Sequence, residues 1–424
     1  MRRRVFLVAA VTAALLLLTW GWLSVDRCGT WDAAPPALQS LGRAAGGLRV
    51  GAAAVEISPK YPATVAGYGP PRPTATSAAA PLFARATVLE VGGQPLALVV
   101  VDTLLVTQAL RAAVQADAGM PVWLVATHTH SSLGGLDQRL AAELAALGSW
   151  DGEQVEAVVK AARTAVAEAK GRLAPARLEI ASGESLGLSA PRSGGEVDAA
   201  LTRVRFLAEG GAIAQWVVLS AHPALVPPGT TALDPDWPGR LAALEAAGGG
   251  PVTLVLQGGS GNASVDRATA TTPDAFARAV HERLSTLTAA TPQDSTELAW
   301  AEVVLGLSRP DASRLAPAPF RAAVENVLCE DADRLVTVAA LRLGPLTLLF
   351  TPAEPSAPAA RVLIEQAGAS RVVSLANGYA GYVEPEEVTR TGGGESNKQY
   401  FDAGFLTRLA DAARLVGQAV AAAR

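Results

Sequence analysis

The sequence contains little histidine, little cysteine and little charge. Of its 424 residues, 4 are histidine and 2 are cysteine, and 17% are charged. Two cysteines, Cys28 and Cys329, cannot build the disulfide framework of a small secreted domain; outside the cytoplasm they would either pair or remain as two thiols. The net charge of −4 is spread along the chain without a basic stripe, which argues against nucleic acid as a partner.

Apolar residues, by contrast, make up 50% of the chain, enough for a large core. From residue 49 onward, short apolar runs typical of strands alternate with amphipathic helical segments. Three pairs of runs, at 84–106, 201–223 and 335–354, surround short glycine-containing turns and predict β-hairpins. No linker divides residues 49–424, so we expect a single large α/β domain with mixed β-sheets flanked by helices.

The N-terminus has three arginines followed by an uncharged apolar run over residues 5–23. Its length is close to the ~20 residues of a membrane-spanning helix, and the arginines favour a cytoplasmic N-terminus. Because no small-residue cleavage site follows, we expect residues 1–24 to be a signal anchor, with a cleaved signal peptide as the alternative. Residues 25–48 would be a linker, and the rest would face the periplasm or exterior, membrane-anchored or, after cleavage, secreted.

Polar side chains follow the predicted buried strands, where open α/β sheets bind their ligands. His128 and His130 follow one apolar run, and His222 and Glu354 follow two others. Further strand ends carry a glycine-rich stretch at 258–264, and Asn377, Tyr379 and Tyr382. The remaining histidine, His281, lies in a predicted helix and is expected at the surface.

Histidine and glutamate side chains that meet at one sheet edge would form a zinc site. Three protein ligands and one open position are usual for catalytic zinc. The spacing between these residues is long-range, however, and an alternative stays open in which each histidine caps a turn by hydrogen bonding.

One segment, ATHTHSSLGG at residues 126–135, resembles the Ala-Thr-His-Thr-His-Ser-Gly-Pro-Gly-Gly signature of the neutral/alkaline, non-lysosomal ceramidases. Seven further segments resemble motifs of that family in the same order along the chain. They are GAAAVEISPKYPATVAGYG at 51–69, VVVDTLLV at 99–106, APRSGGEVDAALTRVRF at 190–206, SAHP with DPDWPG at 220–239, LVLQGGSGNASVD at 254–266, FTPAEPS at 350–356 and NGYAGYVEPEEV at 377–388. The similarity covers roughly residues 49–420.

The resemblance implies a zinc-dependent amidohydrolase. Its substrate would be ceramide or a related N-acyl lipid, cleaved to a sphingoid base and a fatty acid. By position in the motifs, His128, His222, Glu354 and Tyr382 match the family's zinc ligands. The N-terminal helix would keep the enzyme at the membrane in which such a substrate lies.

Further residues match the family's catalytic positions. His130 matches the second histidine of the signature, suited to stabilising an oxyanion, and Arg192 matches the arginine near the substrate carbonyl. The phenol of Tyr382 would also act on the oxyanion. Ser264 matches a serine proposed as the nucleophile, with a metal-activated water as the alternative.

The chain departs from the family pattern at several places, and Ser132 and Leu133 stand where the signature has glycine and proline. Asn262 stands where an aspartate is expected, and Gly394 stands where a catalytic tyrosine is expected. The chain also ends after the last predicted helix, where longer ceramidases continue into an immunoglobulin-like domain. Two alternatives therefore accompany the ceramidase hypothesis: a zinc hydrolase acting on another amide or ester, and a catalytically impaired ceramidase-like binding protein.

Overall fold

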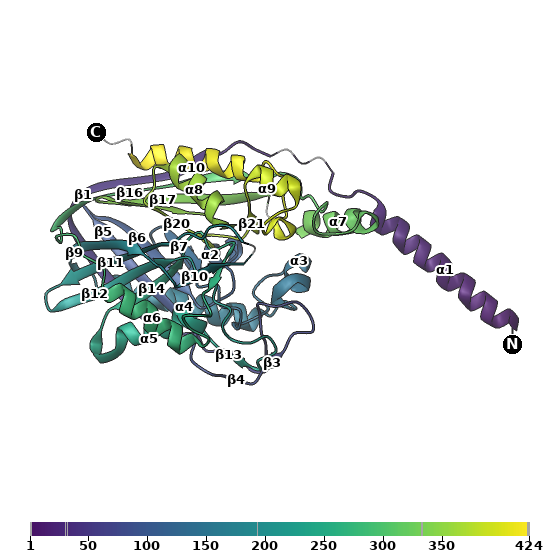
Figure 1. Cartoon of the computed structure of the whole chain (residues 1–424), viewed down its shortest axis with the longest axis horizontal. Helices are drawn as coiled ribbons and strands as arrows, with labels where there is room; N and C mark the ends of the chain where they lie inside the picture. The colour runs from purple at the N-terminus through teal and green to yellow at the C-terminus, as the bar shows by residue number, and fades with distance from the viewer. Residues whose placement is uncertain (1, 30, 32, 193, 332–333, 422–424) are drawn as a thin grey trace.

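Two β-sheets packed face to face form the centre of the molecule, and helices cover their outer faces (Figure 1). The computed structural model describes the chain except for residues 1, 30, 32, 193, 332–333 and 422–424. The expectation of one α/β domain with mixed sheets between helices is confirmed.

The larger sheet has nine strands. Their order is β20(Arg371–Val373), β18(Leu346–Phe350), β17(Leu335–Leu343), β16(Ser295–Gly306), β1(Ala37–Glu56), β5(Phe83–Val91), β6(Gln94–Val101) and β7(Val122–Ala126), with β8(Ala174–Pro175) paired to β1. Most pairs are antiparallel, whereas β6 with β7 and β18 with β20 are parallel. Two of the predicted hairpins, β5–β6 and β17–β18, are confirmed in this sheet.

The smaller sheet has four strands in the order β14(Val252–Gln257), β12(Gly211–Leu219), β11(Ala200–Ala208) and β9(Arg177–Glu184). The third predicted hairpin, β11–β12, turns at Gly210 and Gly211, which both have positive φ angles. Strands β12 and β14 are parallel. Large side chains from both sheets, including Trp123, Phe206 and Trp216, fill the space between the sheets and form the central core.

Helices cover the outer faces because each buries an apolar stripe. On the larger sheet, α4(Gly152–Gly171) lies against β1 and β5, and α10(Phe405–Ala421) with α8(Ala357–Ala367) covers the region of β16 and β17. On the smaller sheet, α5(Asp236–Ala246) packs beside β14, and α6(Pro273–Ser285) packs on α5. The Asp151 carboxylate caps α4 and the Thr272 hydroxyl caps α6, which fixes where both helices begin.

Shorter elements complete the fold, and many of them surround the candidate site. The helices are α2(Gln108–Gln115), α3(Leu140–Ala142), the π-helical turn η1(Glu143–Leu147), η2(Ala247–Gly249), η3(Ala318–Phe320), α7(Arg321–Asp331), α9(Glu386–Thr391) and η4(Ser396–Lys398). The strands are β2(Ala63–Thr64), β3(Thr74–Ala75), β4(Ser77–Ala78), β10(Ser189–Pro191), β13(Ala232–Leu233), β15(Ala263–Val265), β19(Glu354–Pro355) and β21(Tyr382–Val383).

The N-terminal segment forms the helix α1(Arg2–Ser24), which projects away from the two sheets (Figure 1). In the part of the chain that the structure describes, no helix combines the length and apolar character needed to cross a membrane. The predicted signal anchor is therefore not confirmed.

The predicted linker over residues 25–48 is wrong in its second half. Strand β1 begins at Ala37 and pairs with β16 up to Gly47. Proline and glycine breaks indicate a linker here, but Gly42 has a packing reason, since a Cβ atom on it would lie 2.4 Å from the indole of Trp300. The absence of a side chain at Gly42 lets the large Trp300 ring lie across the strand.

The two cysteines form a disulfide bond. Cys28, just after α1, is bonded to Cys329 in α7, across a sequence separation of 301 residues. The sequence left open whether the two cysteines pair or remain as thiols, and the structure shows the disulfide.

Candidate metal centre

The polar strand ends predicted from the sequence lie together. The segments after β7 and β18 of the larger sheet meet those after β12 and β14 of the smaller sheet, because residues from all four segments line one cavity. The backbone turns sharply there, and His128, Leu375 and Asn377 have φ angles of 71°, 60° and 62°. Such conformations cost non-glycine residues free energy, and they cluster at functional sites.

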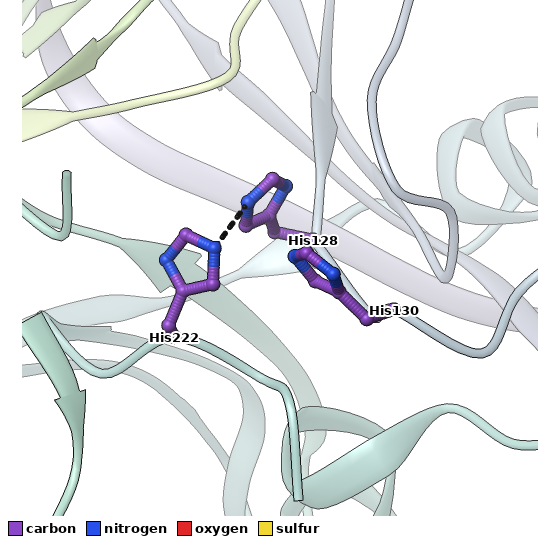
Figure 2. A group of neighbouring side chains, drawn as sticks. All are labelled: His128, His130 and His222. Atoms are coloured by element: carbon purple, nitrogen blue, oxygen red, sulfur yellow. Dashed lines mark hydrogen bonds between the residues drawn. The ribbon is translucent and has the colours of Figure 1, made fainter. Parts of the chain in front are cut away.

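Three histidines form the centre of the cluster (Figure 2). The Nε2 atoms of His128 and His222 are 2.9 Å apart. One ring nitrogen from each of His128, His130 and His222 lies within 4.8 Å of the others. The fourth histidine, His281, is exposed and bonds to Glu245, as expected for a surface residue.

Glu354 brings a carboxylate to the same point. Its Oε2 atom is 3.0 Å from Nε2 of His128 and 3.9 Å from Nε2 of His222. Its Oε1 atom accepts a 2.7 Å hydrogen bond from the hydroxyl of Tyr379, which leaves Oε2 facing the histidines. Strand β19 pairs with β21 in a register that sets Glu354 opposite Tyr382.

Backbone carbonyls orient the two histidines. The Nδ1 atom of His128 donates to the carbonyl oxygen of Leu104 at 2.6 Å, and Nδ1 of His222 donates to that of Ser260 at 3.4 Å. With the proton on Nδ1, each Nε2 atom directs a lone pair toward the other. Hydrogen bonds of this kind fix the tautomer and the ring orientation of metal-binding histidines.

The donor set fits a divalent metal ion. Two Nε2 lone pairs that face each other at 2.9 Å repel unless a cation lies between or beside them. Both ring nitrogens of His130 and Oε2 of Glu354 are buried without a hydrogen-bond partner among the described residues. Buried polar atoms normally have partners, and imidazole nitrogen with carboxylate oxygen is the ligand chemistry of zinc.

Burial keeps His130 and His222 neutral, which is the form that binds a metal. It lowers the pKa of His130 to about 3, with the charge of His128 as the next cause. Burial, followed by the charge of His128, also lowers the pKa of His222 well below its usual value. Burial alone would raise the pKa of Glu354, but its contacts with His128 and Tyr379 lower that pKa to about 2, so the carboxylate is ionised.

Arg192 and Tyr382 lie beside this cluster. Nη2 of Arg192 donates to the Tyr382 hydroxyl at 3.3 Å, and the guanidinium lies 5.6 Å from the centre of the phenol ring. Nη2 also bonds to the carbonyl oxygen of Gly261, and Nε lies 3.5 Å from the carboxylate of Glu395. Burial and the neighbouring Glu354 raise the pKa of Tyr382 well above its ordinary value, so the phenol keeps its proton unless a cation binds beside it.

Ser264 lies in β15 and lines the same cavity. Its backbone forms an isolated β-bridge with His222. Within the described part of the chain, no hydrogen bond joins its hydroxyl to a base, and a serine nucleophile needs a neighbouring base. The geometry therefore favours the water alternative over a serine nucleophile.

A cavity of about 980 Å³ opens above the cluster. Its floor carries all the predicted site residues: His128, His130, Arg192, His222, Ser264, Glu354 and Tyr382. Its walls are mostly apolar, and Leu144 and Leu147 of η1 and Val324 and Leu328 of α7 are among the lining residues. Large apolar pockets with a few converging polar groups are the usual form of a ligand site.

Sequence reasoning missed the roles of two tyrosines. The sequence places Tyr379 at a strand end without indicating a partner, and in the structure its hydroxyl donates a hydrogen bond to Glu354. Tyr400 also lines the cavity, and its ring centre is 6.3 Å from that of Tyr379. The one available signal was the position of Tyr379 at a strand end, three residues before Tyr382.

Comparison with known proteins supports the predicted resemblance. Residues 49–196 match the family described as neutral/alkaline non-lysosomal ceramidase, N-terminal. The crystal structure of neutral ceramidase from Pseudomonas aeruginosa superposes with a TM-score of 0.73 at 21% identity, covering 88% of this chain and 74% of that one. A structure described as ceramidase complexed with C2 gives 0.73 at 20% identity, covering 88% and 75%. No curated protein matches the chain.

Proposed function

We propose that this chain, which carries the neutral ceramidase N-terminal motif over residues 49–196 and shares the ceramidase fold, is a zinc-dependent amidohydrolase. Its substrate would be ceramide or a related N-acyl lipid, cleaved to a sphingoid base and a fatty acid. The observation that carries the proposal is the cluster of three histidines and Glu354 at the floor of a largely apolar cavity.

The metal would be held by Nε2 of His128, Nε2 of His222 and Oε2 of Glu354, with the oxygen of Tyr382 as a fourth ligand. A zinc ion bound there would polarise the amide carbonyl and lower the pKa of a water molecule toward ~7. One carboxylate and two neutral imidazoles leave most of the ion's charge available for this work.

The residues around the metal would stabilise the oxyanion that forms at the amide carbon. Arg192 carries a fixed positive charge, and Glu395, Tyr382 and the carbonyl of Gly261 hold its guanidinium in place. His130 is neutral and its ring nitrogens are free of hydrogen bonds to other described residues, so its N–H can donate to the oxyanion. Preorganised donors of this kind usually contribute most to acyl-transfer catalysis.

The cavity walls favour a substrate with a long alkyl chain. Side chains such as Leu105, Leu144, Val327 and Phe401 line the space beside the polar floor. Each CH₂ group buried there gains about 0.8 kcal/mol, and the same walls exclude water from the reaction. A small polar amide would leave this surface unused.

The disulfide between Cys28 and Cys329 supports an extracytoplasmic location. Disulfides persist in oxidising compartments and are rare in the cytosol. We therefore propose that the catalytic domain lies in the periplasm or outside the cell, held at the membrane by its N-terminal segment or secreted.

The impaired-protein alternative gains support from Gly394. A Cβ atom there would lie 2.4 Å from the carboxylate of Glu384, so the Glu384 side chain would have to move to admit the family's tyrosine. The test is to incubate zinc-loaded protein with palmitoyl-sphingosine and with simpler palmitoyl amides, and to measure fatty acid and amine by mass spectrometry. Equimolar release of both products supports the proposal. Binding without release supports the alternative, and release from simple amides alone supports a different amide substrate.

A further inference from the structure

One wall of the cavity is formed by the helix α7. Ala323, Val324, Val327 and Leu328 all line the cavity, and Phe320 continues the wall just before the helix. Their spacing puts these four helical residues on one face. A molecule in the cavity would therefore contact α7 along its length.

Among the described residues, no strand is a main packing partner of this wall. The main packing partners of α7 are α1, α3 and η3, whereas every long helix of the domain packs on a strand or on a helix that does. Elements with few buried contacts open locally at low free-energy cost. Something other than the core must therefore hold α7 in position.

The segment after α1 supplies that support, and we call residues 25–28 the clamp. Cys28 is bonded to Cys329 of α7. The side chain of Asn326, also in α7, accepts a 2.8 Å hydrogen bond from the backbone N–H of Arg27 and donates a 2.7 Å bond to the carbonyl of Val25. Both contacts join α7 to the chain almost 300 residues earlier.

Charged groups strengthen the same junction. Arg309 contacts Asp26 of the clamp at 2.8 Å and Glu325 of α7 at 3.2 Å. The Asp26 carboxylate also accepts the N–H of Cys28 at 3.0 Å, which shapes the turn at the disulfide. Backbone, side-chain and covalent contacts thus all fix the outer face of α7, opposite the cavity.

We propose that the clamp sets the position of α7 and thereby determines the acyl-chain length that the enzyme prefers. This inference rests on the proposed function, because it concerns the alkyl part of the same substrate. A long acyl chain fills the cavity and contacts α7, whereas a short acyl chain stays near the histidines and Glu354. Loosening α7 removes close contacts from the long chain alone, since dispersion falls steeply with separation.

The test compares the double variant Cys28→Ala/Cys329→Ala and the single variant Asn326→Ala with the wild-type protein. The substrates are acetyl and palmitoyl amides of one amine, and Lys60→Ala, in an exposed ion pair with Glu153, is the control. We expect KM for the palmitoyl amide to rise about tenfold in the double variant, the effect of losing roughly two buried CH₂ groups, with kcat unchanged. KM for the acetyl amide and the zinc content should stay within about twofold.

Asn326→Ala should also raise the ratio of the palmitoyl KM to the acetyl KM, but by a smaller factor, because the disulfide remains in this variant. Amide hydrogen exchange over residues 321–331 should be faster in both variants and unchanged in Lys60→Ala. An unchanged ratio of palmitoyl to acetyl KM in a folded double variant would overturn the proposal. Equal losses for both substrates together with loss of zinc would overturn it too, since they would show a role in the whole fold.

The affinity for a fluorescent long-chain fatty acid separates this proposal from the proposed function. If the wild-type protein hydrolyses no amide, the amidase proposal fails. The clamp proposal then still predicts about tenfold weaker fatty-acid binding by the double variant, and equal binding contradicts it.

Discussion

The Nε2 atoms of His128 and His222 lie 2.9 Å apart, although 94 residues separate them in the sequence. Each Nδ1 atom donates to a backbone carbonyl, so the two Nε2 lone pairs face each other and Oε2 of Glu354. Such an arrangement is stable when a cation occupies the centre. The proposed chemistry depends on that relationship.

Removing the hydroxyl of Tyr379 should weaken metal binding. The Tyr379 hydroxyl holds Oε1 of Glu354 at 2.7 Å and so aims Oε2 at the histidines. Loss of a hydrogen-bond partner of a metal ligand typically lowers metal affinity about 10–100-fold. Zinc titration against a competing chelator should show this loss in Tyr379→Phe and not in Tyr61→Phe, whose ring is 41% exposed. Equal affinity in all three proteins would show that Tyr379 does not position Glu354.

Arg192→Ala should lower kcat while the protein retains its zinc. In the proposed mechanism the guanidinium, which contacts Tyr382 and Glu395, stabilises negative charge on the substrate oxygen. Loss of one such donor usually costs about 10²–10³ in kcat. Arg267→Ala is the matched control, because Arg267 also lines the cavity. Comparable kcat values for the two variants would contradict the role of Arg192.

Gly261→Ala should disturb the metal site through the backbone. A Cβ atom at Gly261 would lie 2.5 Å from the carbonyl oxygen of Glu354 and 2.8 Å from the backbone of Pro355. Overpacking of this kind typically costs about 1–3 kcal/mol, and here it would shift β19 away from the histidines. Gly171→Ala, where a Cβ meets nothing within 4 Å, is the control. Chemical unfolding and zinc titration together measure the effect, and wild-type values for Gly261→Ala would contradict the packing argument.

Asp236 should make stability depend on pH. Burial raises its pKa to about 6 from 3.8, despite bonds from the N–H groups of Val226, Trp237 and Leu225. The folded state therefore keeps the proton longer than the unfolded state. The resulting stabilisation is complete below the unfolded pKa and is lost as pH rises through about 6.

The free energy of unfolding, measured in urea from pH 4 to pH 7, gives the test. Wild-type protein should lose up to about 3 kcal/mol more over this range than Asp236→Asn, which carries no charge at any pH. Parallel curves for the two proteins would show that the carboxyl group titrates alike in the folded and unfolded states.

The hairpins and the strand-end positions could be predicted from the sequence because they follow from local patterns. Alternating apolar runs around Gly92–Gly93 and Gly210–Gly211 define β5–β6 and β11–β12 without reference to the rest of the chain. His128, His222 and Glu354 each follow an apolar strand, and strand ends are where α/β sheets bind ligands, so the sequence indicates them as candidates. Their meeting depends on how the two sheets pack, because β12 belongs to a different sheet from β7 and β18.

Other features depend on distant contacts and left no local pattern. The strand at residues 37–47 consists largely of small residues, and its pairing with β16 and its packing under Trp300 are set by the tertiary fold. The disulfide joins positions 301 residues apart, and α7 has no strong helical signature of its own. The bond from Tyr379 to Glu354 likewise depends on how β19 and β21 pair.

Elemental analysis of the purified protein tests the central claim most directly. The wild-type chain should contain one zinc ion per molecule, and His128→Ala should contain almost none and show no amide hydrolysis. His281→Ala, which alters the exposed histidine, should match the wild-type protein. A wild-type protein that hydrolyses N-acyl amides without bound metal, or a metal-free His128→Ala variant that remains active, would contradict the account.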